Sequence, residues 1–467
     1  MSKNMIVGNP TKSLILFAIP MVVGQLFQQI YSLADTMIVG RTLGQGPLGA
    51  VGSSVAICWV YISIALGLGM GCSVVISQLF GAGRIRQMKT AVNTSILSML
   101  ALSVIFLAIG LLTCDGVMVL MNTPQELIPD ARTYYIIYML GFPGLYLYNI
   151  ANSIFNALGK SKIPLYFLAG SALLNIGLDL WFILGMHWGV AGAAIATIVS
   201  QYLAAILSFI VLLRYLKKEF SVPAYDPTEK HAHEREADPE NESERAKLFD
   251  LSMLSKIARV AIPTMITQSI LSVGIVVMQA LVNSFGSDVM AGFTAASKID
   301  GLAIVPMVQI GNAVSTFTAQ NVGAGKYERV PKGFHAALGM TAVVSITVAA
   351  VMFIWSGPIV GLFMDASSSM AAINIGAEYV QIVCVFYIVM GFMNNTCGVL
   401  RGAGDVMPTM ISLLANFGIR ILFAYVMTGI FHDPVYIWWS NPIGWFVGLG
   451  IAYIRYRSGK WKMKSIV

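Results

Sequence analysis

The chain has 467 residues, of which 57% are hydrophobic and only 11% are charged, and its formal net charge is +7. A soluble domain of this size does not need so much apolar surface, so the composition excludes an ordinary water-soluble protein. The excess positive charge lies in predicted loops and termini, where it favours contact with anionic lipid over binding of nucleic acid.

Apolar runs of about 20 residues recur along the chain, and each is long enough to cross about 30 Å of hydrocarbon. The runs are continuous rather than alternating, which predicts helices and not a barrel, because lipid leaves no backbone group unpaired. The sequence therefore predicts an all-α integral membrane protein with twelve transmembrane helices, at about 14–40, 53–79, 92–113, 133–157, 164–185, 190–214, 257–283, 297–321, 334–356, 377–400, 409–431 and 435–456.

Short motifs recur in the same order in two halves of the chain. The Ala-Ile-Pro motif at 18–20 returns at 261–263, the Gln-x-x-Gly-Ala-Gly-basic turn at 78–84 returns at 320–326, and Asn175 corresponds to Asn416. Six spans in each half predict two parallel six-helix repeats with a substrate cavity between them. We expect an N-terminal six-helix lobe at 1–218, a charged cytoplasmic linker at 219–250 and a C-terminal six-helix lobe at 251–467.

The positive charges predict the orientation of the chain. All but four of the 29 Lys and Arg residues fall in the termini, in the linker or in loops on one side of the membrane. By the positive-inside rule that side is cytoplasmic, and both termini lie there. We therefore expect a multi-pass protein of the cytoplasmic (inner) membrane.

Two predicted spans carry acids, although a charged side chain inside a bilayer costs at least about 2.5 kcal/mol. Asp35 ends a polar stripe on the first span that includes Gln28, and Asp179 lies deep in the fifth span, one helical turn after Asn175. Both acids fall in the outer half of one bundle, where they would titrate as a coupled pair, so we predict that they carry protons. A solvated and inert Asp35 after the first span is the alternative.

The second repeat carries a different set of charges. Arg420, four residues after Asn416, occupies the position that matches Asp179, and it is the only Arg within the predicted spans. It could pair with an acid, bind an anionic group or organise packing, and the role of Asp300 near the start of the eighth span is open. Hydrogen bonds between helices would explain any one of the polar residues here. The candidate cavity residues of this lobe are Gln268, Gln279, Gln309, Asn312, Asn395 and Arg420.

These motifs resemble the multidrug and toxic compound extrusion (MATE) family, and the resemblance covers essentially the whole chain. It depends on the Ala-Ile-Pro motif, on residues 34–40 at the end of the first span, on the two Gln-x-x-Gly-Ala-Gly-basic turns, and on residues 175–179 and 400–405. The resemblance implies an antiporter that uses a cation gradient to export amphipathic, mostly cationic compounds.

Within the family the chain is similar to the DinF-like branch. There an Asp late in helix 1 and an Asn/Asp pair in helix 5 form the cation-linked site, which Asp35, Asn175 and Asp179 match. Asn152 and Thr197 match supporting polar groups, to which Gln28 is added from its stripe. The NorM-like branch instead carries acids in helices 7 and 10, and residues 262–283 here contain none. This difference favours protons over sodium, although carboxylate and amide oxygens would also suit sodium.

Two other functions deserve comparison. A flippase for lipid-linked precursors or polysaccharides, from the wider superfamily, would need a strongly cationic cavity, which Arg420 alone does not supply. A membrane enzyme would need a carboxylate–metal or His-based site, and the five His residues are scattered over loops and span ends. We therefore expect a transporter and not an enzyme, without cofactor or metal, acting as a monomer on small amphipathic molecules and not on nucleic acid.

Overall fold

The computed structural model describes residues 5–43, 45–120, 125–220, 246–364 and 369–467, and most of the predicted linker lies outside this part. Its first half consists of α1 (Pro10–Leu43), α2 (Gln45–Gly81), α3 (Ile85–Leu120), η1 (Gln125–Leu127), α4 (Ile128–Leu140), α5 (Phe142–Ala157), α6 (Lys162–Asp179), η2 (Leu180–Gly185) and α7 (Gly189–Glu219). We call this the N half.

The second half, the C half, follows the same plan. It consists of α8 (Leu251–Asn283), α9 (Ser287–Ala303), α10 (Val305–Gly323), α11 (Arg329–Ile354), α12 (Ser356–Gly361), α13 (Met370–Cys384), α14 (Tyr387–Gly402), α15 (Val406–Phe431), α16 (Val435–Arg457) and the short η4 (Lys460–Met463). The described residues contain no strand.

The prediction of an all-helical membrane protein with twelve spans is confirmed. Nine helical segments of the described chain are each long and apolar enough to cross a membrane, and the pair α13 and α14, bent by 51°, makes a tenth. The α4–α5 pair and α16 occupy the two remaining predicted positions. Large apolar side chains such as Val343 and Ile346 of α11 are exposed, as expected for a surface that meets lipid.

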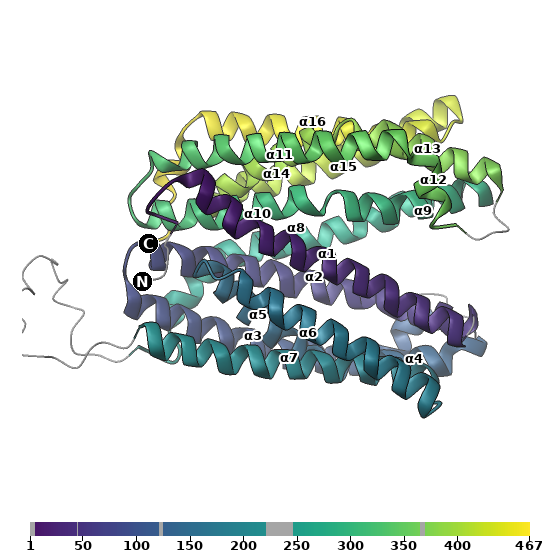
Figure 1. The fold of residues 1–467 in the computed structure, drawn as a ribbon, viewed down its shortest axis with the longest axis horizontal. Coiled ribbons are helices and arrows are strands. Elements are labelled where there is room, and N and C mark those ends of the chain that lie inside the picture. The colour runs from purple at the N-terminus through teal and green to yellow at the C-terminus, as the bar shows by residue number, and fades with distance from the viewer. Residues whose placement is uncertain (1–4, 44, 121–124, 221–245, 365–368) are drawn as a thin grey trace, which may run out of the picture.

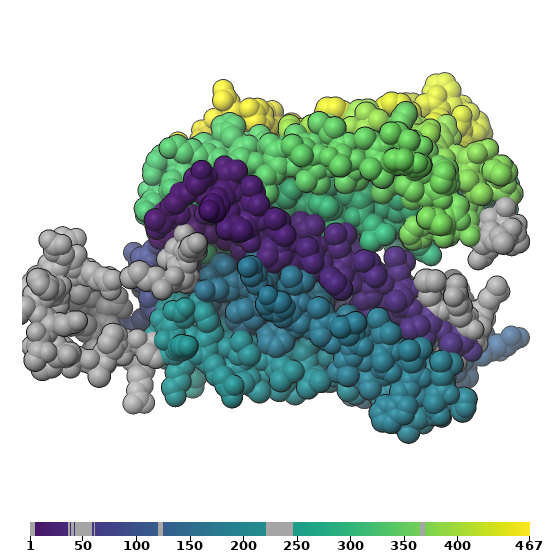
Figure 2. Space-filling view, viewed as in Figure 1, coloured from purple at the N-terminus to yellow at the C-terminus, as the bar shows by residue number. Residues whose placement is uncertain are grey.

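The two halves lie side by side, and both chain termini lie at one end of the bundle (Figure 1). We call this end the terminal face and the opposite end the far face. In Figure 2, α1 crosses from one half to the other along the visible surface.

The first helix of each half begins in the core of the other half. Leu14 and Phe17 of α1 are buried in the apolar core that the C half builds. Ile257 and Val260 of α8 are buried in the core of the N half. Because α1 also contacts α6 and α7, and α8 also contacts α15, each of these helices links the two halves.

A pair of glutamines joins the halves at the terminal face. Gln78 of α2 donates from Nε2 to the carbonyl oxygen of Gly402, at 2.9 Å. Gln320 of α10 donates in the same way to the carbonyl oxygen of Ala157, at 2.8 Å. Both glutamines are fully buried, so the bonds are shielded from competing water.

The chain ends complete this arrangement. The backbone N–H of Met5 donates to Gln320 Oε1 at 3.2 Å, and the backbone N–H of Ile466 donates to Gln78 Oε1 at 2.9 Å. Each terminal segment thus binds a glutamine of the opposite half. We call Gln78, Gln320 and their four backbone partners the terminal latch.

The latch requires glycine where α2 and α10 cross. A Cβ atom at Gly81 would collide with the backbone carbonyl of Gln320, and one at Gly323 would collide with the carbonyl of Gln78. Without side chains at these two positions the helix ends can approach closely enough for the glutamine bonds to form.

We predict that Gly81→Ala opens the terminal face, because the added methyl group separates α2 from α10. Ser77 is fully buried beside the latch, so a Ser77→Cys reporter is expected to react several times faster with a membrane-impermeant maleimide when Gly81→Ala is present. Gly450→Ala, where a Cβ atom meets open space, is the matched control. Equal labelling in the two backgrounds would show that the glycine contact does not hold the latch closed.

Candidate functional site

Two acids from different helices meet inside the N half. Asp35 lies in α1, and Asp179 is the last residue of α6. Their carboxyl groups lie within hydrogen-bonding reach of each other. Asp179 has no exposed surface, whereas Asp35 is partly buried. The structure therefore brings together two residues that are 144 positions apart in the chain.

Asn175 connects the acids to their neighbours. With the amide oriented to satisfy all of its contacts, its nitrogen donates to Asp179 Oδ2 at 2.8 Å and to the Tyr31 hydroxyl at 3.3 Å. Its oxygen accepts from the backbone N–H of Thr197 at 3.1 Å. Asn175 thereby fixes one carboxyl oxygen of Asp179 and ties α6 to α1 and α7.

The contact between the two acids has a chemical consequence. Ionised carboxylates only accept hydrogen bonds, so a hydrogen bond between two carboxyl groups requires at least one proton. Oδ1 of Asp35 and Oδ1 of Asp179 have no hydrogen-bond partner within the described residues, although both atoms are buried. The pair therefore has free oxygen atoms that a second proton or a small cation could occupy.

Tyrosines that the sequence analysis missed surround the pair. The Tyr31 hydroxyl is hydrogen-bonded to the Thr197 side chain as well as to Asn175. Tyr134 and Tyr138 of α4 stack at 5.7 Å and lie near Asp35. A signal was present for Tyr31, because it precedes Asp35 by four residues and so shares its helix face. The α4 residues could be found only in the folded structure.

The helix that carries Asp179 changes form immediately after it. The α-helical part of α6 ends at Asp179, and η2 continues as a π-helical turn. Trp181, Phe182 and Trp188 stack in succession around this turn, with centroids 5.3 and 5.0 Å apart. Such π-helical turns occur often at functional sites, where the extra residue redirects neighbouring side chains.

The supporting residues predicted from the sequence divide into two groups. Thr197 lies at the acid pair, through its backbone N–H and its hydroxyl. Asn152 accepts a hydrogen bond from Asn156 at 2.9 Å and makes no described bond to the acids. Gln28 is exposed, one turn before Tyr31 on α1.

The C half has a mixed charge cluster. Asp300 of α9 accepts a hydrogen bond from the Tyr387 hydroxyl at 2.7 Å and another from Tyr379. Arg420 lies close enough to interact electrostatically with the Asp300 carboxyl group. Arg420 Nε is buried without a hydrogen-bond partner in the described part of the chain. Where the N half places two acids, the C half thus places an acid and a base, with Asn416 matching Asn175.

The other C-half candidates do not form one cluster. Gln279 donates to Asn283 at 2.8 Å, and Asn312 donates to Gln309 at 3.3 Å. Asn395 is fully buried and donates to Thr341 at 2.8 Å, a helix–helix bond within the C half. Gln268 lines a small pocket, described next.

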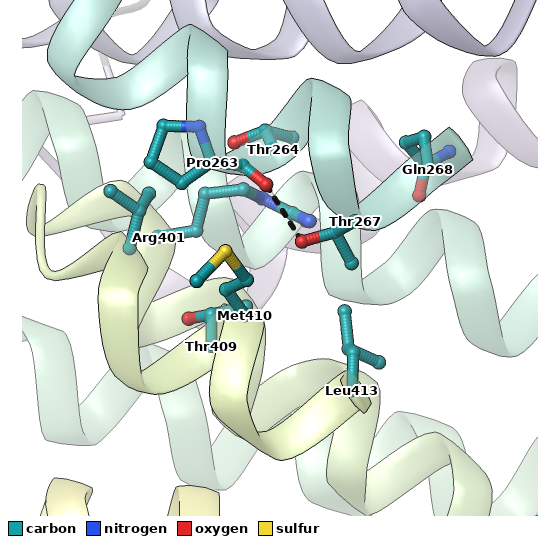
Figure 3. Close-up of a pocket in the computed structure, with 9 residues that line it drawn as sticks. Pro263, Thr264, Thr267, Gln268, Arg401, Thr409, Met410 and Leu413 are labelled. Atoms are coloured by element: carbon teal, nitrogen blue, oxygen red, sulfur yellow. Dashed lines mark hydrogen bonds between the residues drawn. The ribbon is translucent and has the colours of Figure 1, made fainter. Parts of the chain in front are cut away.

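Another Arg of the C half lies beside a small pocket. Arg401 lies in the last turn of α14, and its guanidinium faces a pocket between α8, α14 and α15 (Figure 3).

These features define a class of protein. Two parallel helical repeats with ionisable groups buried inside them are typical of membrane carriers. A family profile, described as MatE, matches residues 20–181 and 263–426, one region in each half. The chain belongs to this family, the MATE transporters.

Individual relatives extend over nearly the whole chain. It is 29% identical over 467 residues to the probable multidrug resistance protein YpnP of Bacillus subtilis, covering 98% of this chain and 97% of that one. It is 24% identical over 466 residues to a probable multidrug resistance protein NorM of Thermotoga maritima, covering 98% and 94%. A solved structure of a multidrug resistance MATE family transporter in an outward-facing conformation superposes with a TM-score of 0.86 at 23% identity, covering 99% and 98%.

Proposed function

We propose that this chain exports amphipathic, mostly cationic compounds from the cytoplasm by alternating access, in exchange for protons. The observation that supports the proposal most directly is the close approach of the two buried acids Asp35 and Asp179. Relatives named as multidrug resistance proteins support the substrate class. The aromatic side chains near the pair suit planar cations, which bind to the faces of such rings.

The negative charge of the acid pair couples proton binding to the binding of a cationic substrate. With one shared proton the pair keeps one negative charge, which attracts a cation. A second proton from outside removes that charge, and substrate affinity falls as a result. Proton and cationic substrate therefore compete for the same negative charge, as antiport requires.

Helix α1 connects this site to the terminal latch. Asp35 lies in its far part, Pro20 lies inside it, and Leu14 lies in the core of the C half. A proline removes one helical hydrogen bond and allows a bend. Protonation at Asp35 can thus change how α1 packs at the far face and, through a bend near Pro20, at the latch.

Basic residues support a cytoplasmic position for the terminal face. Lys326 donates to the carbonyl oxygen of Ile6 at 3.1 Å, and Arg329 donates to those of Met5 and Gly8 at 3.3 and 3.0 Å. Clustered Lys and Arg favour the cytoplasmic side. In this orientation the closed latch seals the cytoplasmic end of the path, and substrate leaves at the far face.

We predict that a fluorescent lipophilic cation leaves cells that express this chain, and that export stops when the proton gradient is collapsed. Dye efflux is measured with the proton and sodium gradients dissipated separately, because the acid pair could bind either ion. If export continues without a proton gradient but stops without a sodium gradient, the coupling ion is sodium.

We predict that Asp179→Asn folds and inserts at wild-type yield but loses coupled export. The change removes a buried charge, so the cost of insertion does not rise. The amide cannot exchange a proton with Asp35, so coupling is lost. Asp115→Asn, at an exposed acid that pairs with Arg132, is the matched control. If Asp179→Asn transports dye against its concentration gradient at the wild-type rate, Asp179 does not belong to the coupling site.

A further inference from the structure

The segment that follows α16 is anchored in the C half. Gly459 has a φ of 70°, a left-handed conformation that turns the chain away from the axis of α16. Trp461 of η4 then lies in the core of the C half and is only 1% exposed. Its indole N–H donates to the carbonyl oxygen of Tyr456 at 3.1 Å, and the two rings stack. The first part of this segment is therefore fixed to the C half.

The next residues cross to the N half. Figure 1 places the C-terminal end of the chain at the terminal face, between the two halves. The side chains of Ile466 and Val467 pack against the apolar core of the N half. The backbone N–H of Ile466 donates to Gln78 Oε1 at 2.9 Å, and the hydroxyl of Ser465 donates to the same atom at 3.5 Å. Residues 459–467, which we call the strap, thus connect the two halves at the terminal face.

A glycine of the C half makes room for the strap. A Cβ atom at Gly404, after the end of α14, would lie 2.7 Å from the carbonyl oxygen of Lys464 and 2.8 Å from the side chain of Ile466. The φ of Gly404 is 89°, which also disfavours any residue with a side chain. The strap can therefore follow its path to the N half only while this position lacks a Cβ atom.

The N-terminal segment occupies the equivalent place in the other half. Gly159 corresponds to Gly404 in the repeat, and a Cβ atom there would lie 3.9 Å from the side chain of Met5. Met5 and Ile466 each donate a backbone N–H to the latch glutamine of the half opposite to that glycine. Because this arrangement occurs twice, bridging of the halves is a property of the terminal face and not of one segment.

The two segments differ in how firmly they are held. The carbonyl oxygen of Met5 also accepts from Arg329 at 3.3 Å, and the Met5 side chain is buried in the C-half core. In the strap, Trp461 is buried, whereas Ile466 and Val467 are only partly buried. Exposing partly buried apolar groups costs less than exposing a buried Trp. If the halves separate at the terminal face, the N-half end of the strap is therefore the one that detaches.

We infer that residues 459–467 form a releasable strap that holds the terminal face closed. Opening of this face detaches Ile466 and Val467 from the N half, while Trp461 keeps the strap on the C half. The inference rests on the alternating access proposed above, and it adds an element outside the helices that sets the balance between closed and open states. Whatever weakens the contact of the strap with the N half shifts this balance toward the open terminal face.

The test measures the distance between the halves at the terminal face of the purified full chain. Spin labels are attached to Gln87→Cys and Glu328→Cys, exposed positions at the starts of α3 and α11. The five native Cys residues are buried and do not compete for the label. Pulsed electron spin resonance then gives the fraction of molecules in which the labels are far apart.

Ile466→Asp is expected to raise the fraction of molecules with long distances severalfold, because a carboxylate does not enter the apolar core of the N half. Met463→Asp is the matched control. It lies in the same segment, and Met463 is 78% exposed, so the distances are expected to stay as in the parent chain. Equal distance distributions in the parent chain and in Ile466→Asp would overturn the strap.

Gly404→Ala keeps the inference testable if Ile466→Asp does not fold. The added methyl group displaces the strap without changing any residue that contacts the N half, so long distances are again expected to increase severalfold. Gly286→Ala is the control for backbone strain, because its φ is 94° and a Cβ atom there meets open space. If Gly286→Ala increases the long distances as much as Gly404→Ala does, strain and not the strap is responsible, and the inference is wrong.

Failure of the export function is recognised separately. The spin labels report opening of the terminal face without substrate or an ion gradient. Proteoliposomes with the wild-type chain are tested in parallel for export of a cationic dye. Absence of dye export contradicts the proposed function, whereas distances that do not respond to Ile466→Asp and Gly404→Ala contradict only the strap.

Discussion

Two carboxyl groups that touch inside a membrane cannot both be ionised without a compensating charge, and this constraint organises the N half. Asp35 and Asp179 come from α1 and α6, so their contact joins two helices through a proton. Asn175 holds Asp179 in place, and Tyr31 holds Asn175. We propose that a change in the number of protons on the pair changes how α1 and α6 pack.

The helices α1 and α8, each of which begins in the core of the opposite half, connect the acid pair to the rest of the molecule. Because Leu14 of α1 lies in the core of the C half and Val260 of α8 lies in the core of the N half, the halves cannot rock without moving α1 and α8. The glutamines Gln78 and Gln320 then hold the terminal face closed. The two repeats share this frame but differ in charge, since Arg420 stands where the N half has an acid.

Much of the fold could be predicted from the sequence, because apolar length and internal repetition are properties of the chain itself. The membrane cost of a charge also marked Asp35 and Asp179 as candidates, and the structure places them together. Tertiary partners could not be predicted. Tyr134 reaches the site from α4, and Asp300 meets Tyr387 only after α9 and α14 pack.

The most direct test of proton–substrate competition is the affinity of the purified chain for a cationic dye as a function of pH, without sodium. Affinity is expected to weaken as pH falls, by at most about tenfold for each unit of pH, the limit for one competing proton. The dependence is expected to vanish in Asp35→Asn and in Asp179→Asn alike. Binding that is independent of pH in the wild-type chain but changes with sodium would contradict proton coupling at this site.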